Sequence, residues 1–167
     1  MISPCRAQGA EKKKAQSKTS VLKRTEVFYL GGFMRFITLT DEFYDKYSEC
    51  KEILHKKNRP YALLSIKVDG KLYGLPIRHH IAHPYSFRTI NDSGIDFTKA
   101  VLIEDQNYIA GETVIEEKEW KIINREENTI KYEFGKYLNQ FKRAMKHRDN
   151  PRSKNIIKYS ALQYFDV

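Results

Sequence analysis

The sequence predicts a single domain of the α+β class, in which a β-hairpin and further strands combine with amphipathic helices. Three observations indicate this. The chain has 167 residues, of which 41% are hydrophobic and 13% aromatic, enough for one hydrophobic core. Asp69-Gly70 separates two apolar runs, which is the strongest short signal for a hairpin. Residues 130–145 repeat apolar side chains at helical spacing.

The first elements follow residue 35. FITLT at residues 36–40 predicts a short strand, and either Thr40 or Asp41 can cap a helix that follows it. The buried face of that helix is expected at Phe43, Tyr47, Cys50 and Leu54. We expect the helix to end before Arg59-Pro60, because a residue that precedes proline avoids the helical conformation.

Three strands and a long helix come next. YALLSIKV at 61–68 and KLYGLPIR at 71–78 form the hairpin, and IDFTKAVLIE at 95–104 predicts a third strand. The apolar face of the long helix is Ile130, Phe134, Tyr137, Leu138, Phe141 and Met145. We expect Asn150-Pro151 to stop this helix and ALQYF at 161–165 to form a closing strand.

Residues 1–33 differ from the domain at 34–167. They carry seven Lys/Arg against two Glu, and their first 20 residues are polar and aperiodic, which is typical of disorder. Two interpretations stay open. The segment is a basic tail, or it lies upstream of a translation start at Met34, since the codons of Gly31-Gly32 could spell a purine-rich ribosome-binding site.

The positive charge is concentrated near the C-terminus. The whole chain has a net charge of +9, which favours a polyanionic partner. Residues 131–158 hold nine Lys/Arg against two acidic residues, whereas 34–130 hold 14 against 16. The polar face of the long helix carries Lys136, Lys142, Arg143, Lys146 and Arg148. We expect this face to follow an RNA backbone, with a solvated face as the alternative.

Aromatic side chains near these basic residues have two expected roles. We expect Tyr132, Tyr137 and Phe141 to lie in the core. Tyr85 and Phe87 are the candidates for stacking on RNA bases, with His80 as a further RNA contact.

The segment PIRHHIAHPY at 76–85 holds three of the five histidines. His79 and His83 have the i, i+4 spacing of helical metal ligands, but prolines bound the segment and no adjacent carboxylate completes a site. A polar loop without chemistry is another alternative. Proton transfer is favoured, because imidazole titrates near neutral pH. RNA supplies its own 2′-hydroxyl nucleophile, so cleavage needs only a base, an acid and a cation.

Arg78, His79 and His83 can supply that set without a metal or cofactor, with the acid and base roles of the two histidines left open. Lys99 in the third predicted strand can add a second cation, and a solvated lysine is the alternative.

No apolar run approaches the roughly 18 residues that span a bilayer, and no secretory signal is present, so we expect a cytoplasmic protein without membrane contact. Cys5 and Cys50 lack the number and spacing of a disulfide scaffold or a cysteine zinc site, and we expect free thiols.

Three segments in order carry a family resemblance: RPYALLSIKVDGKLYGLPIRHHIAHPYSF, GIDFTKAVLIED and SALQYF. Together they resemble the endoribonuclease toxins of type III toxin-antitoxin systems, the ToxN and AbiQ family, over roughly residues 34–165. The similarity is closer to the TenpN and CptN branches, where Arg and His belong in the loop after the hairpin. ToxN itself has hydroxyl residues and a nearby lysine there, so the identity of acid and base does not carry over.

The resemblance implies a compact domain with a strongly twisted antiparallel sheet surrounded by helices, related to the Kid and MazF toxins. It also implies a metal-independent, sequence-specific endoribonuclease of the bacterial cytoplasm that leaves 2′,3′-cyclic phosphate ends. Its inhibitor would be a tandem-repeat RNA that the toxin itself cuts into pseudoknot units, bound in a cyclic protein–RNA assembly, with a possible role against phage. Arg78 and His79 fall in the family's catalytic segment, and Lys99 falls on the lysine of its GxDxxK strand.

Two other functions remain open. One is a non-catalytic RNA-binding protein that uses the same basic and aromatic residues. The other is a metal-dependent nuclease that uses His79 and His83.

Overall fold

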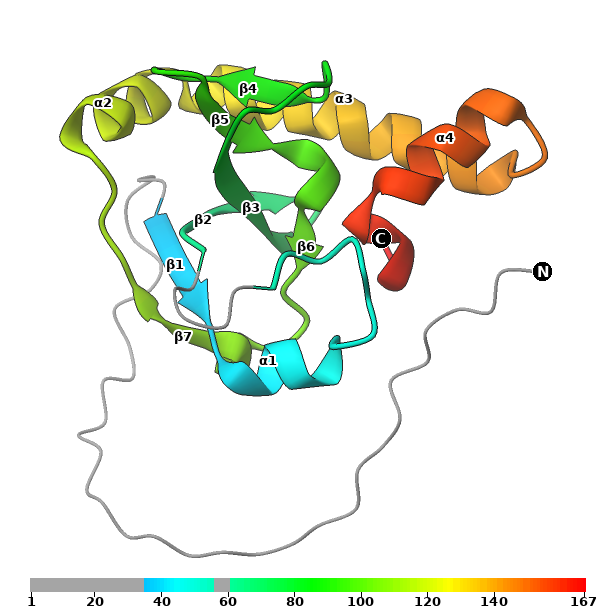
Figure 1. The fold of residues 1–167 in the computed structure, drawn as a ribbon, viewed down its shortest axis with the longest axis horizontal. Helices are drawn as coiled ribbons and strands as arrows, with labels where there is room; N and C mark the ends of the chain where they lie inside the picture. Colours follow the sequence, from blue (N-terminus) through cyan, green and yellow to red (C-terminus); the bar gives the residue numbers. More distant parts are fainter. Residues whose placement is uncertain (1–34, 56–60) are drawn as a thin grey trace, which may run out of the picture.

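The structure is a computed structural model that describes residues 35–55 and 61–167 (Figure 1). The expectations for the basic leader, the start at Met34, the Cys5 thiol and the Arg59-Pro60 helix end lie outside these residues. Within the described residues, no helix combines the length and apolar character needed to cross a bilayer.

The fold is α+β, as predicted, with one seven-stranded antiparallel sheet and four α-helices in the described residues. The strands are β1 (Arg35–Leu39), β2 (Leu63–Val68), β3 (Lys71–His79), β4 (Ser86–Arg88), β5 (Ser93–Asp96), β6 (Val101–Leu102) and β7 (Ile109–Glu112). The helices are α1 (Asp41–Lys46), α2 (Glu117–Arg125), α3 (Glu127–Lys146) and α4 (Pro151–Tyr159). The strand order is β4-β5-β3-β2-β1-β7, and β6 also pairs with β3.

Two tight turns set the register around β3. In the predicted hairpin, Val68 pairs with Lys71, and Asp69 (φ 50°) and Gly70 (φ 78°) adopt the left-handed conformations of a type I′ turn. A second hairpin joins β4 to β5 through Asn91 and Asp92, whose φ angles are also positive. This hairpin was not predicted, because β4 has only three residues. Its strand β5 pairs with the last three residues of β3.

The prediction of one continuous strand at 95–104 is wrong. It divides into the end of β5, a 3₁₀ turn at Phe97–Lys99, and β6. The break follows from Asp96, whose carboxylate accepts the backbone N–H of Thr98 at 2.9 Å and so caps the turn. Lys99 therefore lies in a turn that faces the C-terminal part of the chain, and not in a strand.

The first helix is shorter than predicted and ends at Lys46. Thr40 caps it, as expected, by accepting the N–H of Phe43. Tyr47 and Cys50 are buried but lie beyond the helix, and Ile53 is buried where Leu54 was expected. Tertiary contacts override the helical spacing here, since Tyr47 donates a hydrogen bond to Glu104 and packs on Phe165.

The long helix is confirmed as α3, whose expected apolar face is buried except for the half-buried Met145. Phe134 on this face contacts Tyr73 of β3 and Phe97 of the 3₁₀ turn, so α3 packs across the sheet (Figure 1). The helix α2 before it was not predicted.

The segment after α3 corrects two expectations. Asn150-Pro151 begins a helix, since the Asn150 side chain accepts the N–H of Arg152 and proline occupies the first turn of α4. The expected closing strand at 161–165 is instead a 3₁₀ turn at Ala161–Tyr164, capped by Ser160. The first correction arises because a capping residue was interpreted as a break.

Candidate functional site

Arg78 and Asp96 form an ion pair across two strands. Arg78 of β3 lies opposite Gly94 of β5, and Asp96 follows two residues later on the same face of the sheet. Glycine is required at position 94, because a Cβ there would lie only 2.6 Å from the carbonyl oxygen of Phe87. Nη1 of Arg78 donates to Oδ2 of Asp96 at 2.5 Å.

The Asp96 carboxylate is fully buried, with 0% of the residue exposed. Its Oδ1 atom accepts both the backbone N–H of Thr98 at 2.9 Å and the Thr98 hydroxyl at 2.6 Å. A buried carboxylate needs such partners, because desolvation penalises its charge by several kcal/mol. The three hydrogen bonds fix the carboxylate in one orientation.

His83 faces the same carboxylate. Its Nε2 atom lies 3.4 Å from Oδ1 of Asp96 and 3.4 Å from the Thr98 hydroxyl. Its Nδ1 atom is buried and has no hydrogen-bond partner in the described part of the chain. When Nε2 carries a proton and points it at the carboxylate, Nδ1 is a proton acceptor. This ring therefore has one nitrogen beside Asp96 and a second, buried nitrogen that forms no hydrogen bond within the described residues.

Lys99 lies in the 3₁₀ turn that Asp96 caps, and Arg78, His83, Asp96 and Lys99 are called the Asp96 cluster from here on. Its Nζ donates to the backbone carbonyl of Tyr159 at 3.1 Å. Burial lowers the pKa of the Lys99 amine, while the negative charges of Asp96 and Glu52 act in the opposite direction and Arg78 adds to the lowering. The amine is therefore easier to deprotonate than that of an ordinary lysine.

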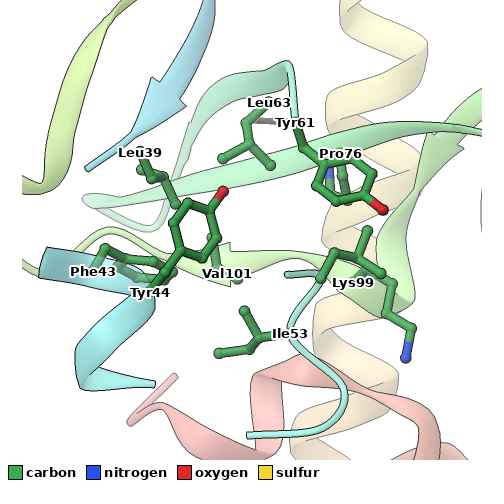
Figure 2. Close-up of a pocket in the computed structure, with 10 residues that line it drawn as sticks. Leu39, Phe43, Tyr44, Ile53, Tyr61, Leu63, Pro76, Lys99 and Val101 are labelled. Atoms are coloured by element: carbon green, nitrogen blue, oxygen red, sulfur yellow. The ribbon is translucent and has the colours of Figure 1, made fainter. Parts of the chain in front are cut away.

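The stem of Lys99 borders a small apolar hollow, shown in Figure 2. Leu39, Phe43, Ile53, Tyr61 and Pro76 are among the other lining residues, and the amine points away from them. The hollow has room of about 10 Å³, which suits one water molecule and no substrate.

Tyr85 links His83 to α3. Its ring centre lies 6.3 Å from that of His83 and 5.3 Å from that of Tyr137. The Tyr137 hydroxyl donates to the buried Ser160 hydroxyl at 2.8 Å, and burial raises the pKa of Tyr137, so this hydroxyl stays protonated. Tyr85 and Phe87, the expected stacking residues, are both half-buried against the core.

His79 is separated from the cluster by strand alternation. It pairs with Ser93, whose hydroxyl contacts the buried Glu119 of α2, and so lies on the sheet face opposite to Arg78. His80 is exposed with φ 55°, and its Nδ1 lies 2.5 Å from a carboxylate oxygen of Asp92. The structure places Arg78 and His83 against Asp96 and Lys99 in the turn that Asp96 caps, and it does not bring His79 there.

The basic residues predicted to form one face of α3 differ in their surroundings. Lys142 lies 3.7 Å from the Asp69 carboxylate at the hairpin turn, and Arg148 lies beyond the end of the helix. Lys136, Arg143 and Lys146 are exposed and follow one another at helical spacing.

Tyr132 begins the same exposed row and corrects an expectation. It was predicted to lie in the core but is 68% exposed, with the Lys136 ammonium 5.4 Å from its ring centre. Its position two residues before Phe134 turns it to the opposite side of the helix.

Four residues at or near the site were missed by the sequence analysis: Asp96, Thr98, Tyr159 and Ser160. Asp96 left a signal, since it is the single carboxylate in the apolar run GIDFTKAVL and precedes by two residues a threonine that it caps. Tyr159 and Ser160 left none, because their contacts with Lys99 and Tyr137 are distant in sequence.

Comparison of the chain with protein-family models, with curated proteins and with solved structures gives no match. Cys50 is buried. Within residues 35–55 and 61–167, no three or more His, Cys, Asp or Glu residues gather in a group that could hold a metal ion.

Asp96→Asn is expected to lower the free energy of unfolding by about 2–4 kcal/mol, because it leaves the Arg78 guanidinium without its counter-charge. The matched control is Asp92→Asn at an exposed carboxylate that contacts Arg88 and His80, where a change below about 1 kcal/mol is expected. Urea denaturation of both variants measures this. Equal losses in the two variants would contradict the central role of Asp96.

Proposed function

We propose that the protein is a metal-independent endoribonuclease, the toxin of a type III toxin-antitoxin system. One observation carries the proposal: Arg78 and His83, both predicted from the sequence, contact the buried Asp96 carboxylate, and Lys99, also predicted, lies in the turn that this carboxylate caps. A cation, an imidazole and an easily deprotonated amine are the groups that cleavage at a 2′-hydroxyl requires.

In the proposed reaction His83 is the base. It removes the proton of a ribose 2′-hydroxyl, and the 2′-oxygen attacks the adjacent phosphorus. The support for this role is the contact of Nε2 with Asp96, which orients the ring and stabilises the imidazolium that forms. His79 is less suited to the acid role, since it lies on the other face of the sheet.

Lys99 takes the acid role in its place, and Arg78 neutralises the phosphate. As the bond from phosphorus to the 5′-oxygen breaks, Lys99 protonates that oxygen, which leaves a 2′,3′-cyclic phosphate and a 5′-hydroxyl. The lowered pKa makes the Lys99 ammonium a stronger acid than that of an ordinary lysine, which supports this role. The Arg78 side chain is 31% exposed and retains N–H groups beyond the one that contacts Asp96.

The toxin identity rests on the resemblance to the TenpN and CptN branches of the ToxN and AbiQ family. That resemblance implies a twisted-sheet fold related to Kid and MazF, a cytoplasmic location, and inhibition by a tandem-repeat RNA in a cyclic assembly. The exposed row Lys136, Arg143 and Lys146 is a suitable surface for the backbone of that RNA.

A non-catalytic RNA-binding protein is the alternative. The observation that favours it is the burial of Nδ1 of His83, because the imidazole must turn before this nitrogen can accept a proton from RNA. Short tandem repeats upstream of the gene, followed by a terminator, would favour the toxin over this alternative.

His83→Ala is expected to slow RNA cleavage about 10²- to 10⁴-fold in single-turnover assays, because the reaction loses its base. His79→Ala is the matched control, with a change of less than about 10-fold expected from its place on the opposite face. The assay is run in EDTA, and the ends of the products are analysed for 2′,3′-cyclic phosphate.

Three outcomes would contradict the assignment. Equal cleavage rates in His83→Ala and the unsubstituted protein would exclude His83 as the base. Loss of activity in EDTA, restored by a divalent ion, would favour the metal-dependent nuclease. No cleavage of any RNA by the unsubstituted protein would favour the RNA-binding alternative.

The cleavage rate is expected to fall with rising pH at a value below 10.5, the ordinary pKa of lysine, because burial lowers the pKa of Lys99 and the acid must be protonated. In Lys99→Arg the decline should disappear and the maximal rate should drop, since guanidinium stays charged but donates a proton poorly. Single-turnover rates against pH measure this, with Lys136→Arg as the control. A Lys99→Arg profile that keeps the original decline would exclude Lys99 as the acid.

The exposed row of α3 is expected to contact RNA phosphates. Lys136→Ala/Arg143→Ala/Lys146→Ala should lower the slope of log affinity against log salt by about 2, at about 0.7 for each lost contact with a single strand. Lys142→Ala is the matched control, because that lysine faces Asp69. A 2′-O-methyl oligonucleotide, which cannot be cleaved, serves as the ligand. An unchanged slope in the triple variant would mean that the row is only solvated.

A further inference from the structure

Tyr159 is an exposed aromatic side chain at the edge of the Asp96 cluster. It is one of four large apolar residues that are exposed in the described part of the chain, with 53% of its surface accessible. The others are Val114, Trp120 and Tyr132, and within residues 35–55 and 61–167 none of them forms a side-chain hydrogen bond or ring contact with the cluster. Exposure costs a tyrosine ring the free energy of burial, so its location next to a candidate site invites a functional explanation.

The position of Tyr159 relative to Lys99 is fixed by the backbone. Its carbonyl oxygen accepts the Lys99 amine at 3.1 Å, and the next residue, Ser160, is buried and accepts the Tyr137 hydroxyl at 2.8 Å. Both contacts belong to the end of α4 and leave the Tyr159 side chain out of the core. The ring therefore belongs to the same residue as the carbonyl that binds the Lys99 amine, the amine proposed to act on RNA.

The helix that carries Tyr159 is positively charged. The Lys158 ammonium lies 5.2 Å from the ring centre. The helix α4 has no acidic residue, and its basic residues Arg152, Lys154 and Lys158 are all exposed. A nucleotide next to this ring would therefore meet an aromatic surface for its base and a cation for its phosphate.

We propose that Tyr159 is a stacking platform for the nucleobase that neighbours the phosphate bound by Arg78 and Lys99. The proposal rests on the proposed function for the location of that phosphate. Every base has an aromatic face, so the ring provides affinity and orientation with little selection among bases. Lys158 binds the adjoining phosphate group, which places the RNA strand across the end of α4.

The test uses 2-aminopurine, whose fluorescence is quenched when it stacks. It is placed in turn at each position of a 2′-O-methyl oligonucleotide that contains a cleaved sequence or, if no RNA is cleaved, a sequence that the protein binds. We expect at least one position to be quenched on binding to the unsubstituted protein and to Tyr159→Phe, but not to Tyr159→Leu. Affinity for Tyr159→Leu should be about 5- to 100-fold weaker.

The matched control is Tyr132→Leu, because Tyr132 is also exposed and also has a lysine over its ring, but lies on the outer side of α3. It should leave the quenching at that position intact. Tyr159→Leu keeps the backbone carbonyl that holds Lys99, so loss of quenching reports on the ring itself.

The outcomes separate this proposal from the proposed function. If Tyr159→Leu quenches every position as the unsubstituted protein does, or if no oligonucleotide binds, the platform is excluded. If His83→Ala abolishes cleavage while Tyr159→Leu keeps its quenching, the nuclease stands and the platform fails. If quenching depends on Tyr159 but no RNA is cleaved, the platform stands and the nuclease fails.

Discussion

The buried carboxylate of Asp96 is the constraint on which the rest of the candidate site depends. It accepts hydrogen bonds from Arg78 and from two donors of Thr98, and it lies 3.4 Å from His83. Without access to water, this charge is stable only while those partners stay in place. The same carboxylate also caps the 3₁₀ turn that carries Lys99. One side chain thereby sets the positions of a guanidinium, an imidazole and an amine.

The sheet supplies the rigidity that this arrangement needs. Two type I′-like turns, at Asp69-Gly70 and at Asn91-Asp92, align β2, β3, β4 and β5 in one register. A shift of one residue between β3 and β5 would place Arg78 opposite a different residue and turn Asp96 to the other face. The short β4–β5 hairpin is therefore as important for the site as the longer hairpin before it.

The sequence could predict those parts of the fold that have strong local signals. The Asp69-Gly70 hairpin and the apolar face of α3 are of this kind, since one depends on a turn and the other on helical periodicity. The parts that it could not predict depend on distant contacts or on ambiguous residues. Pro151 was expected to stop a helix, but it lies in the first turn of α4. The three residues of β4 pair only because β5 lies beside them.

The site shows the same division. Arg78, His83 and Lys99 could be nominated because their side chains suit phosphate chemistry, whatever their environment. The role of Asp96 becomes visible only when Arg78 is placed diagonally across from it on the next strand. The separation of His79 from His83 likewise depends on the alternation of a strand that was predicted to end one residue earlier.

The hydrogen bond from Lys99 to the Tyr159 carbonyl also has a consequence for biosynthesis. The two residues are 60 positions apart, so a ribosome adds the acceptor roughly 3–12 s after the donor at about 5–20 residues per second. During that interval the nascent chain holds the hairpins and Asp96 but lacks the segment that fixes the amine and the Tyr137 hydroxyl. The cluster is therefore completed only after the segment that holds Tyr159 has been added, and a product terminated before that segment would leave the ribosome without an assembled site.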